Sequence, residues 1–290
     1  MKREDLSPVT VRGYVSDLEM FIAWLKQSRG TKVRLNQIST IELINYRQHL
    51  IAVKGLKPAT VNRRLEALRR FCKWACNQKL IKRDIALELK AVRTVRSQRP
   101  IGLAEPEVHM LLRAAGQSRH GLAKRNYALI QLMLQAGLRV GEVAALSVAD
   151  VPIRERSGIV RIRQGKGGKE REVPLNATAR RALSIYQESR QKTGAEDFLF
   201  TNARGNRLPT RTIQAVITEL ARRAKISRVK VSAHTLRHTF ALNYLRQNPG
   251  KLVDLATLLG HESLDTTAIY TRPSGEELAA DLERSRYNVY

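Results

Sequence analysis

The sequence is poor in cysteine, in acidic residues and in long apolar segments, and each shortage excludes a class of protein. The two cysteines, Cys72 and Cys76, have no further cysteine or nearby histidine to complete a metal site. We therefore expect buried, reduced thiols, as in a cytoplasmic protein. The most apolar stretch, 128–136, is too short to span a membrane and is broken by Gln131 and Gln135. The first residues lack the apolar core of a secretory signal peptide.

The shortage of acidic residues leaves a large positive charge. Lysine and arginine number 52 against 26 aspartates and glutamates, so 290 residues carry a formal net charge of +26. A surplus of this size predicts a polyanionic partner, and nucleic acid is favoured over a membrane surface. The sequence has no P-loop and no acidic cluster suited to magnesium. We therefore expect neither a nucleotide nor a metal cofactor.

Hydrophobic periodicity and turn residues divide the chain into two domains and a linker. Residues 1–90 show helical spacing throughout, whereas residues 91–100 have no periodicity and contain arginines and a closing proline, which is typical of an extended basic linker. In residues 101–290, helical segments flank one alternating stretch that predicts a β-hairpin. We expect a mainly α-helical protein with a small hairpin or sheet in its second domain.

Three helices are expected in residues 1–90. Gly30 would end the first, whose apolar positions are Val11, Tyr14, Val15, Leu18, Ile22 and Leu25. The pair Ser39 and Glu42 forms a capping box that would open the second. Pro58 would open the third, whose inner face holds Val61, Leu65, Leu68, Cys72 and Ala75.

The outer face of this third helix is strongly basic. It carries Arg63, Arg64, Arg69, Arg70 and Lys73. A run of this kind is usually a solvated face, but here few acidic residues accompany it. We therefore expect this face to bind phosphates, with Arg63, Arg64 and Arg70 as DNA contacts.

The second domain is expected to be built of helices around one hairpin. Helices are predicted near 105–115, 122–136, 177–191, 210–224, 234–247 and 251–259, and strands at 159–163 and 172–175. Gly137 would cap the end of the second of these helices, and Ser232 would cap the start of the fifth. A short helix at 266–271 would carry Tyr270, and residues 276–284 would form a terminal helix.

Five residues suit one kind of chemistry. Arg139, His234, Arg237 and His261 are cationic or can become so, and Tyr270 supplies a phenol. An aromatic hydroxyl can attack a phosphodiester while positive groups hold the phosphate oxygens. For so basic a chain, a nucleic-acid phosphate is the natural electrophile.

The histidine pair in 234–238 allows a second interpretation. His234 and His238 have the spacing of a zinc-binding helix, but the glutamate that would act as base is absent. Arg237 would also place a positive charge beside any cation. We therefore expect no metal, and we interpret His238 as a packing residue outside the site.

Four segments, taken in order, carry a resemblance. They are 136–143 with Arg139, 165–169 with Lys166, 234–238 with His234 and Arg237, and 259–270 with His261 and Tyr270. Together they resemble the signature boxes of the tyrosine recombinases, the phage-integrase family, and most closely its compact Xer-type bacterial members. Ala233 stands where proline is common and Ala136 where threonine is common, but neither change removes a reactive group.

The roles follow from the chemistry. A free tyrosine has a pKa near 10, so Tyr270 needs a proton acceptor or cationic neighbours that favour phenolate. His234 is the candidate acceptor. Arg139 and Arg237 would clamp the non-bridging phosphate oxygens, and His261 would add a donor there.

The resemblance also assigns roles to residues that the spacing alone leaves open. It implies that Lys166, at the hairpin tip, protonates the departing 5′-oxygen. Lys169 is the alternative in the same turn and a further DNA contact. Glu142, three residues after Arg139, would support that side chain, although an ordinary surface ion pair fits equally well.

The resemblance implies a site-specific DNA recombinase with a 3′-phosphotyrosyl intermediate. It implies a SAM-like first domain and a catalytic second domain that form a C-shaped clamp on double-stranded DNA with inverted-repeat core sites. Four protomers, identical or shared with a paralogue, would exchange strands through a Holliday junction in the nucleoid. The alternatives are a type IB topoisomerase and a catalytically silent architectural DNA-binding protein. Dimer resolution, plasmid or transposon resolution, and integration all remain open as roles.

Overall fold

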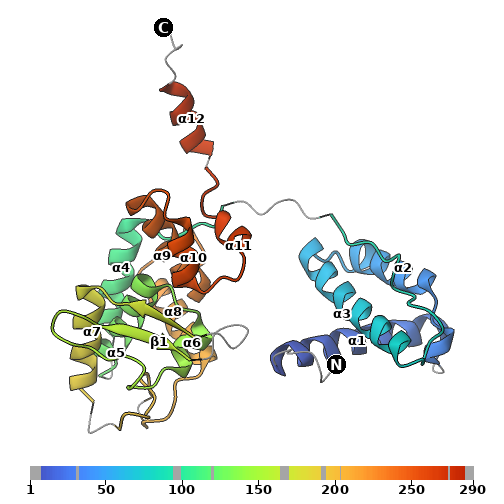
Figure 1. Cartoon of the computed structure of the whole chain (residues 1–290), viewed down its shortest axis with the longest axis horizontal. Helices are drawn as coiled ribbons and strands as arrows, with labels where there is room; N and C mark the ends of the chain where they lie inside the picture. Colours follow the sequence, from blue (N-terminus) through green and yellow to red (C-terminus); the bar gives the residue numbers. More distant parts are fainter. Residues whose placement is uncertain are drawn as a thin grey trace. The chain divides into compact units, whose positions relative to one another are not determined.

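The computed structural model describes residues 8–30, 33–93, 99–118, 121–163, 170–190, 194–202, 204–273 and 275–284. The chain divides into two compact units, Met1–Arg96 and Ser97–Tyr290, which are coloured along the sequence in Figure 1. Part of the expected linker, 94–98, lies outside the described residues. Among the described segments, no helix combines the length and the apolar character that a membrane crossing requires.

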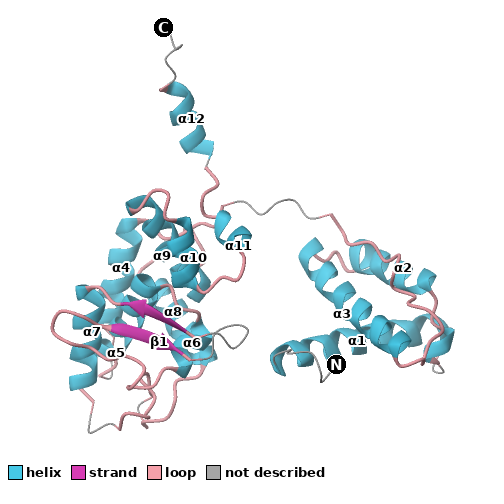
Figure 2. Cartoon of the chain, in the orientation of Figure 1, coloured by secondary structure: helices cyan, strands magenta, loops and turns pink. Residues whose placement is uncertain are grey.

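Every regular element described in the first unit is a helix, as predicted, and turns and coil follow the last of them over residues 78–93 (Figure 2). Its elements are α1 (Pro8–Arg29), a 3₁₀ turn (Leu35–Gln37), α2 (Thr40–Gln48), a π-helical turn (His49–Val53) and α3 (Pro58–Asn77). The capping box forms as expected: the Ser39 backbone N–H donates to Glu42 Oε2 at 2.6 Å. The predicted inner face of α3 is buried at all five positions.

The predicted core face of α1 is only partly correct. Val15 and Ile22 are exposed, whereas Phe21 and Leu25 are buried. The helix is turned by an aromatic cluster, in which the Phe21 ring lies 5.0 Å from that of Tyr46. Aromatic rings bury large areas and prefer tilted pairing, so they outweigh the aliphatic pattern here.

The two thiols differ in burial. Cys72 is buried and Cys76 is half-buried, and both are free. Burial raises the pKa of the Cys72 thiol to about 12, with a smaller contribution from Asp84. The expectation of buried thiols is therefore met in full by Cys72 and only in part by Cys76.

The second unit surrounds a two-stranded sheet with helices (Figure 2). In order, it contains α4 (Glu105–Gly116), α5 (Ala123–Ala136), α6 (Val140–Ala145), β1 (Ile159–Ile162), β2 (Arg171–Pro174), α7 (Ala177–Glu188), α8 (Thr210–Arg223), α9 (Ala233–Gln247), α10 (Leu252–Leu259), α11 (Leu264–Ala268) and α12 (Gly275–Glu283). The strands are antiparallel, with Ile159 opposite Pro174 and Ile162 opposite Arg171. The predicted fold class, mainly α with one small hairpin, is confirmed.

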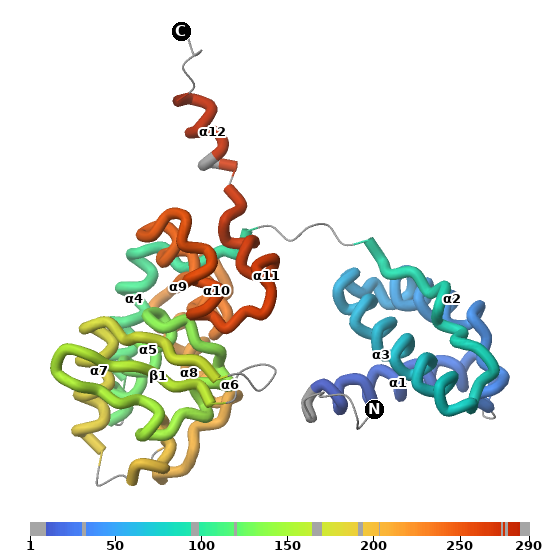
Figure 3. The backbone as a smooth tube through the Cα atoms, in the orientation of Figure 1, coloured from blue at the N-terminus to red at the C-terminus, as the bar shows by residue number. Residues whose placement is uncertain are grey.

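Helix α5 is the centre of the second unit. It is buried along most of its length and packs against α4, α7 and α9. At the other end of the sequence, α10 contacts both α9 and α11, and Figure 3 shows these three segments side by side. One expectation is wrong in detail: α11 ends at Ala268, so Tyr270 lies in the turn after it.

Gly137 ends α5 in a conformation that only glycine adopts freely. Its φ is +62°, and a Cβ at this position would lie 2.3 Å from Phe240 Cδ1 on α9. The predicted C-cap is confirmed. The close approach also brings the chain after α5 against α9, where Arg237 lies.

Replacing Gly137 by alanine should lower the melting temperature of the full chain. Positive φ and the ring contact together should cost about 2 kcal/mol or more, which is roughly 5 °C for a unit of this size. Gly141→Ala is the matched control. Gly141 lies in α6 with no atom within 4 Å of its Cβ position, so alanine there should stabilise by about 0.5–1 kcal/mol. Calorimetry measures both, and equal melting temperatures would contradict the packing argument.

Candidate active site

The C-terminal end of α10 collects three arginines. Each of three consecutive backbone carbonyls accepts a hydrogen bond from a different guanidinium. The pairs are Leu258 O with Arg171 Nε at 3.0 Å, Leu259 O with Arg237 Nη2 at 2.8 Å, and Gly260 O with Arg139 Nη2 at 3.1 Å. The last carbonyls of a helix lack helical partners and carry partial negative charge, so they suit cations.

Gly260 makes this arrangement possible. Its φ is +63°, and a Cβ there would lie 2.8 Å from Arg171 Nη1. The left-handed turn ends α10 and places His261 directly beyond the carbonyls. Glycine is therefore required at this position for both its conformation and its lack of a side chain.

Glu142 is the buried counter-ion of the cluster. Arg171 Nη1 and Nη2 donate to its two carboxylate oxygens at 2.9 Å each, and Arg139 Nη1 donates to Oε1 at 2.9 Å. The Arg139 backbone N–H also donates to Oε2 at 2.7 Å. Burial opposes ionisation, but the hydrogen bonds and charge of Arg171, with the hydrogen bonds of Arg139, outweigh it and hold the pKa of Glu142 below its ordinary value.

Arg237 is the most deeply enclosed of the three cations. Its side chain donates from Nη1 to Gly137 O at 2.7 Å, and Nη2 lies 2.9 Å from His261 Nε2. Burial, followed by the positive charge of Arg139, lowers the pKa of Arg237 to about 10. It therefore stays protonated at neutral pH, held by backbone carbonyls instead of a carboxylate of its own.

The contacts of His261 determine its tautomer. A guanidinium can only donate, so His261 Nε2 accepts from Arg237, and the ring proton is on Nδ1. Nδ1 then donates to Thr267 Oγ1 at 2.8 Å. Burial, followed by the charges of Arg237 and Arg139, lowers the pKa of His261 to about 4. The ring is neutral in this state, with both nitrogens engaged.

Tyr270 is buried beside the same cluster. Burial raises the pKa of its phenol, and the positive charges of Arg237 and Arg139 offset part of that rise. The hydroxyl lies 2.8 Å from Nδ1 of His238, which the sequence pattern predicts to be a packing residue outside the site. Burial, followed by the charges of His234 and Arg237, lowers the pKa of His238, so this imidazole is neutral at pH 7.

The remaining predicted residues lie apart from this core. His234 is exposed on the first turn of α9, with its ring 6.5 Å from that of His238. Ser232 caps this helix as predicted, accepting from the Thr235 N–H at 3.2 Å. Lys166 and Lys169 lie outside the described residues. No group of three or more histidines, cysteines or acids with metal-binding geometry occurs in the part of the chain that is described.

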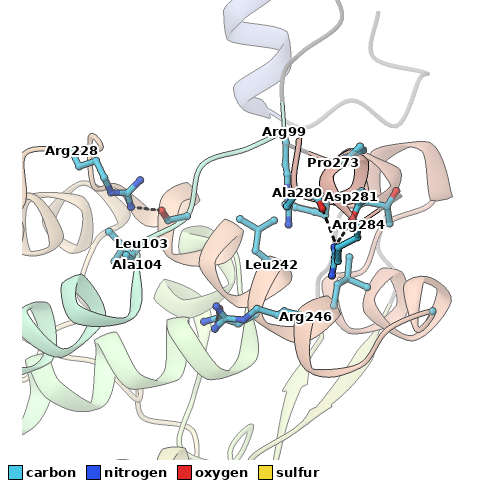
Figure 4. Close-up of a pocket in the computed structure, with 16 residues that line it drawn as sticks. Arg99, Leu103, Ala104, Arg228, Leu242, Arg246, Pro273, Ala280, Asp281 and Arg284 are labelled. Atoms are coloured by element: carbon cyan, nitrogen blue, oxygen red, sulfur yellow. Dashed lines mark hydrogen bonds and ion pairs between the residues drawn. The ribbon is translucent and has the colours of Figure 1, made fainter. Parts of the chain in front are cut away.

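A basic pocket of about 750 Å³ reaches Tyr270 from outside (Figure 4). Four arginines, Arg99, Arg228, Arg246 and Arg284, contribute to its lining. Arg228 is held by Glu107, with Nε to Oε1 at 3.0 Å. Asp281 also lines the pocket and pairs with Arg284, so acids neutralise part of this positive charge.

The predicted DNA-contacting arginines of α3 are engaged within their own unit. Arg63 forms an ion pair with the buried Asp17, and Arg64 lies 3.8 Å from the same carboxylate. Arg70 Nε donates to Glu66 Oε1 at 3.1 Å. The basic face is therefore braced by more acidic residues than the sequence indicated, although Arg63 and Arg70 remain partly exposed.

Three residues of the cluster were missed from the sequence. His238 carried a usable signal, because it follows Arg237 directly and lies one helical turn after His234. Arg171 carried none, because its place beside Glu142 depends on how β2 packs against α10. Thr267 likewise becomes visible only through the contact with His261.

Replacing Glu142 by glutamine should destabilise the chain in a pH-dependent way. Breaking a buried ion pair costs about 3 kcal/mol or more. Because the folded pKa of Glu142 is lowered, its contribution is present above its unfolded pKa and is lost as pH falls through the folded value. The difference in melting temperature between the two chains should therefore be largest at neutral pH and shrink below about pH 4.

Glu172→Gln on β2 is the matched control. Glu172 pairs with Arg161 at 2.9 Å, but both side chains are more than half exposed. Removing this pair should cost less than about 1 kcal/mol. If the two variants melted alike from pH 3 to 7, the structural weight given to Glu142 would be wrong.

Comparison with known proteins agrees with this geometry. Residues 102–277 match the Phage integrase family, and residues 1–79 match the Phage integrase, N-terminal SAM-like domain. The tyrosine recombinase XerD of Ralstonia nicotianae is 34% identical over 279 residues, covering 95% of this chain and 87% of the relative. XerD of Rhizobium meliloti is 35% identical over 276 residues, covering 93% and 86%.

Solved structures share the fold. The crystal structure of XerA recombinase is 27% identical with a TM-score of 0.55, covering 97% of this chain and 94% of XerA. XerH bound to a palindromic difH substrate, in a post-cleavage complex, is 23% identical with a TM-score of 0.78, covering 95% and 80%. Both family matches occur in order along one chain, the two XerD relatives exceed 30% identity, and the chain therefore belongs to the phage integrase family of tyrosine recombinases.

Proposed function

We propose that this chain is a site-specific DNA recombinase that cuts and rejoins strands through a 3′-phosphotyrosyl link at Tyr270. One observation carries the proposal: a buried phenol lies where the charges of Arg237 and Arg139 both act on it. The net charge of +26 supports DNA as the partner. Family membership and the recombinase relatives support the same activity over a topoisomerase or a silent DNA-binding protein.

The two arginines would bind the scissile phosphate. Arg237 and Arg139 are each anchored by backbone carbonyls near the end of α10, which fixes their guanidinium planes. Their remaining N–H groups are assigned to the non-bridging oxygens, whose charge grows in the pentavalent transition state. A phosphate oxygen would also compete with His261 Nε2 for the Arg237 N–H. His261 would then donate to the phosphate in the form that carries a proton on Nε2.

The strand-cleavage step conserves the phosphodiester. The Tyr270 oxygen forms a bond to phosphorus, the bond from phosphorus to the 5′-oxygen breaks, and the 5′-oxygen takes up a proton. Lys166 is assigned as the source of that proton, with Lys169 as the neighbouring alternative. His234, the proton acceptor expected from the sequence, is exposed on the first turn of α9 and is assigned instead to a contact with the phosphate. Rejoining reverses these steps, so no nucleotide is consumed and the arginines supply the charge that a metal would supply elsewhere.

Assembly follows from the same proposal. Two domains would enclose duplex DNA as a C-shaped clamp at inverted-repeat core sites, and four protomers, identical or shared with a paralogue, would exchange strands through a Holliday junction. Helix α12 supports contact with a neighbouring protomer, because Leu278 and Leu282 are exposed on it. The XerD relatives are named as tyrosine recombinases, which supports recombination as the activity. Dimer resolution, plasmid or transposon resolution, and integration are all roles that this activity can serve.

Tyr270→Phe should bind DNA but form no covalent complex. The substrate is a duplex that wild-type protein selects from a randomised pool, nicked near the cleavage point so that the covalent product is trapped. The wild-type chain should give a protein–DNA adduct on a denaturing gel in the presence of EDTA, and the variant should give none. An adduct formed by the variant would assign the nucleophile elsewhere, and loss of the wild-type adduct in EDTA would indicate a required metal.

Neutralising the basic face of α3 should weaken DNA binding. Arg70→Gln should make the plot of log binding constant against log salt concentration shallower by about one unit, because one phosphate contact is lost. Glu66→Gln is the control, since it removes the acid that pairs with Arg70 and should leave the slope unchanged. Arg63→Gln and Arg64→Gln should reduce the slope in the same way. Because both arginines lie beside the buried Asp17, their melting temperatures are measured first to show that the variants remain folded. A slope unaffected by Arg70→Gln would make this face an ordinary solvated surface.

A further inference from the structure

We propose that His238 is a catalytic residue that takes the proton from the Tyr270 hydroxyl during cleavage and returns it during rejoining, an inference that rests on the proposed function. From the sequence alone, His234 is the expected acceptor of this proton. The structure instead places His238 Nδ1 at 2.8 Å from the Tyr270 oxygen. A general base must reach the proton that it removes, and this distance is within hydrogen-bond range.

The direction of the hydrogen bond follows from the chemistry of its partners. A phenol is a stronger donor than a neutral imidazole N–H, and an imidazole nitrogen is a stronger acceptor than a phenol oxygen. The hydroxyl of Tyr270 therefore donates to Nδ1 of His238, and the ring proton of His238 lies on Nε2. The lone pair of Nδ1 points at the proton that must leave before or during attack.

The surroundings keep both partners in the form that this step needs. Burial, then the charges of His234 and Arg237 on the same helix, lower the pKa of His238 below 6.5 and keep the ring uncharged. Burial raises the pKa of Tyr270 above 10.0, while Arg237 and Arg139 act in the opposite direction. Transfer is thus unfavourable before attack, so the proton moves as the new bond to phosphorus forms and the phenol oxygen becomes acidic.

The step balances without any co-reactant. During cleavage, the Tyr270 O–H bond breaks, its proton goes to His238 Nδ1, and the oxygen's electron pair forms the bond to phosphorus. The leaving 5′-oxygen takes a proton from the separate acid on its own side. During rejoining, the 5′-hydroxyl gives its proton back to that separate group as its oxygen attacks phosphorus, the bond from phosphorus to the Tyr270 oxygen breaks, and His238 returns its proton to the Tyr270 oxygen.

The position of His234 suits a different task. Its side chain is exposed, whereas Tyr270 is buried, and the two histidine rings are 6.5 Å apart. The exposed ring is available to DNA, and the half-buried ring of His238 is available to the phenol. His234 and His238 lie one helical turn apart on the same face of α9, so one can contact DNA while the other contacts the phenol.

His238→Asn tests the proposal because an amide can replace the Nδ1 contact but cannot take a proton. Single-turnover adduct formation on the nicked duplex should slow by roughly 10²- to 10⁴-fold. The defect should persist on a duplex with sulfur in place of the bridging 5′-oxygen, because a thiolate leaves without a proton but the phenol must still lose one. A defect in the leaving-group acid would instead be rescued by sulfur.

The pH profile separates catalysis from structure. The wild-type rate should rise with pH and level off near the lowered pKa of His238, whereas the variant rate should keep rising with hydroxide into the alkaline range. A variant whose rate of adduct formation is within about threefold of the wild-type rate would overturn the assignment. So would a variant whose rate still falls at acidic pH as the wild-type rate does, or one whose rate does not rise at alkaline pH. If the wild-type chain itself forms no adduct, the proposed function fails instead, so the two failures are distinguishable.

Discussion

The end of α10 is the constraint on which the site depends. Three adjacent carbonyls hold three guanidiniums that would otherwise repel one another, and they do so without adding negative charge that would repel a phosphate. One carboxylate, Glu142, neutralises part of the excess and is itself enclosed by two of the arginines. The cluster is thus preorganised as a net cation, which is the state that binds and stabilises a phosphoryl transition state.

Much of this protein could be predicted from its sequence, because local signals agree with the fold at most positions. Gly137 and Ser232 form the expected caps, and the inner face of α3 is buried as its spacing indicates. The face of α1 was wrong because aromatic packing outweighed aliphatic periodicity around Phe21. The bounds of short elements also differ from the prediction: α11 ends at Ala268, and the Tyr270 N–H donates to Thr267 O at 3.0 Å in the turn that follows.

In the site, too, some residues can be predicted from local sequence and others only from the folded structure. The candidate reactive residues are predictable because their side chains have distinctive chemistry, whereas the residues that hold them are visible only in three dimensions. Arg171 lies 87 residues before the carbonyl it binds, and no sequence spacing indicates that pairing. A single histidine on a helix is commonly a packing residue, which is why the sequence places His238 outside the site, and its contact with Tyr270 is the reason to propose a role for it.

The run of adjacent carbonyls at Leu258, Leu259 and Gly260 also limits how this segment can change. Each carbonyl is matched to one arginine by its position along the backbone, and successive carbonyls point in different directions around the helix end. Inserting or deleting one residue at this junction would rotate every acceptor away from its partner at once. A substitution elsewhere on α10 changes one contact at a time, whereas a change in the length of this turn changes all three. The turns at Gly137 and Gly260 therefore fix the positions of the three arginines relative to one another.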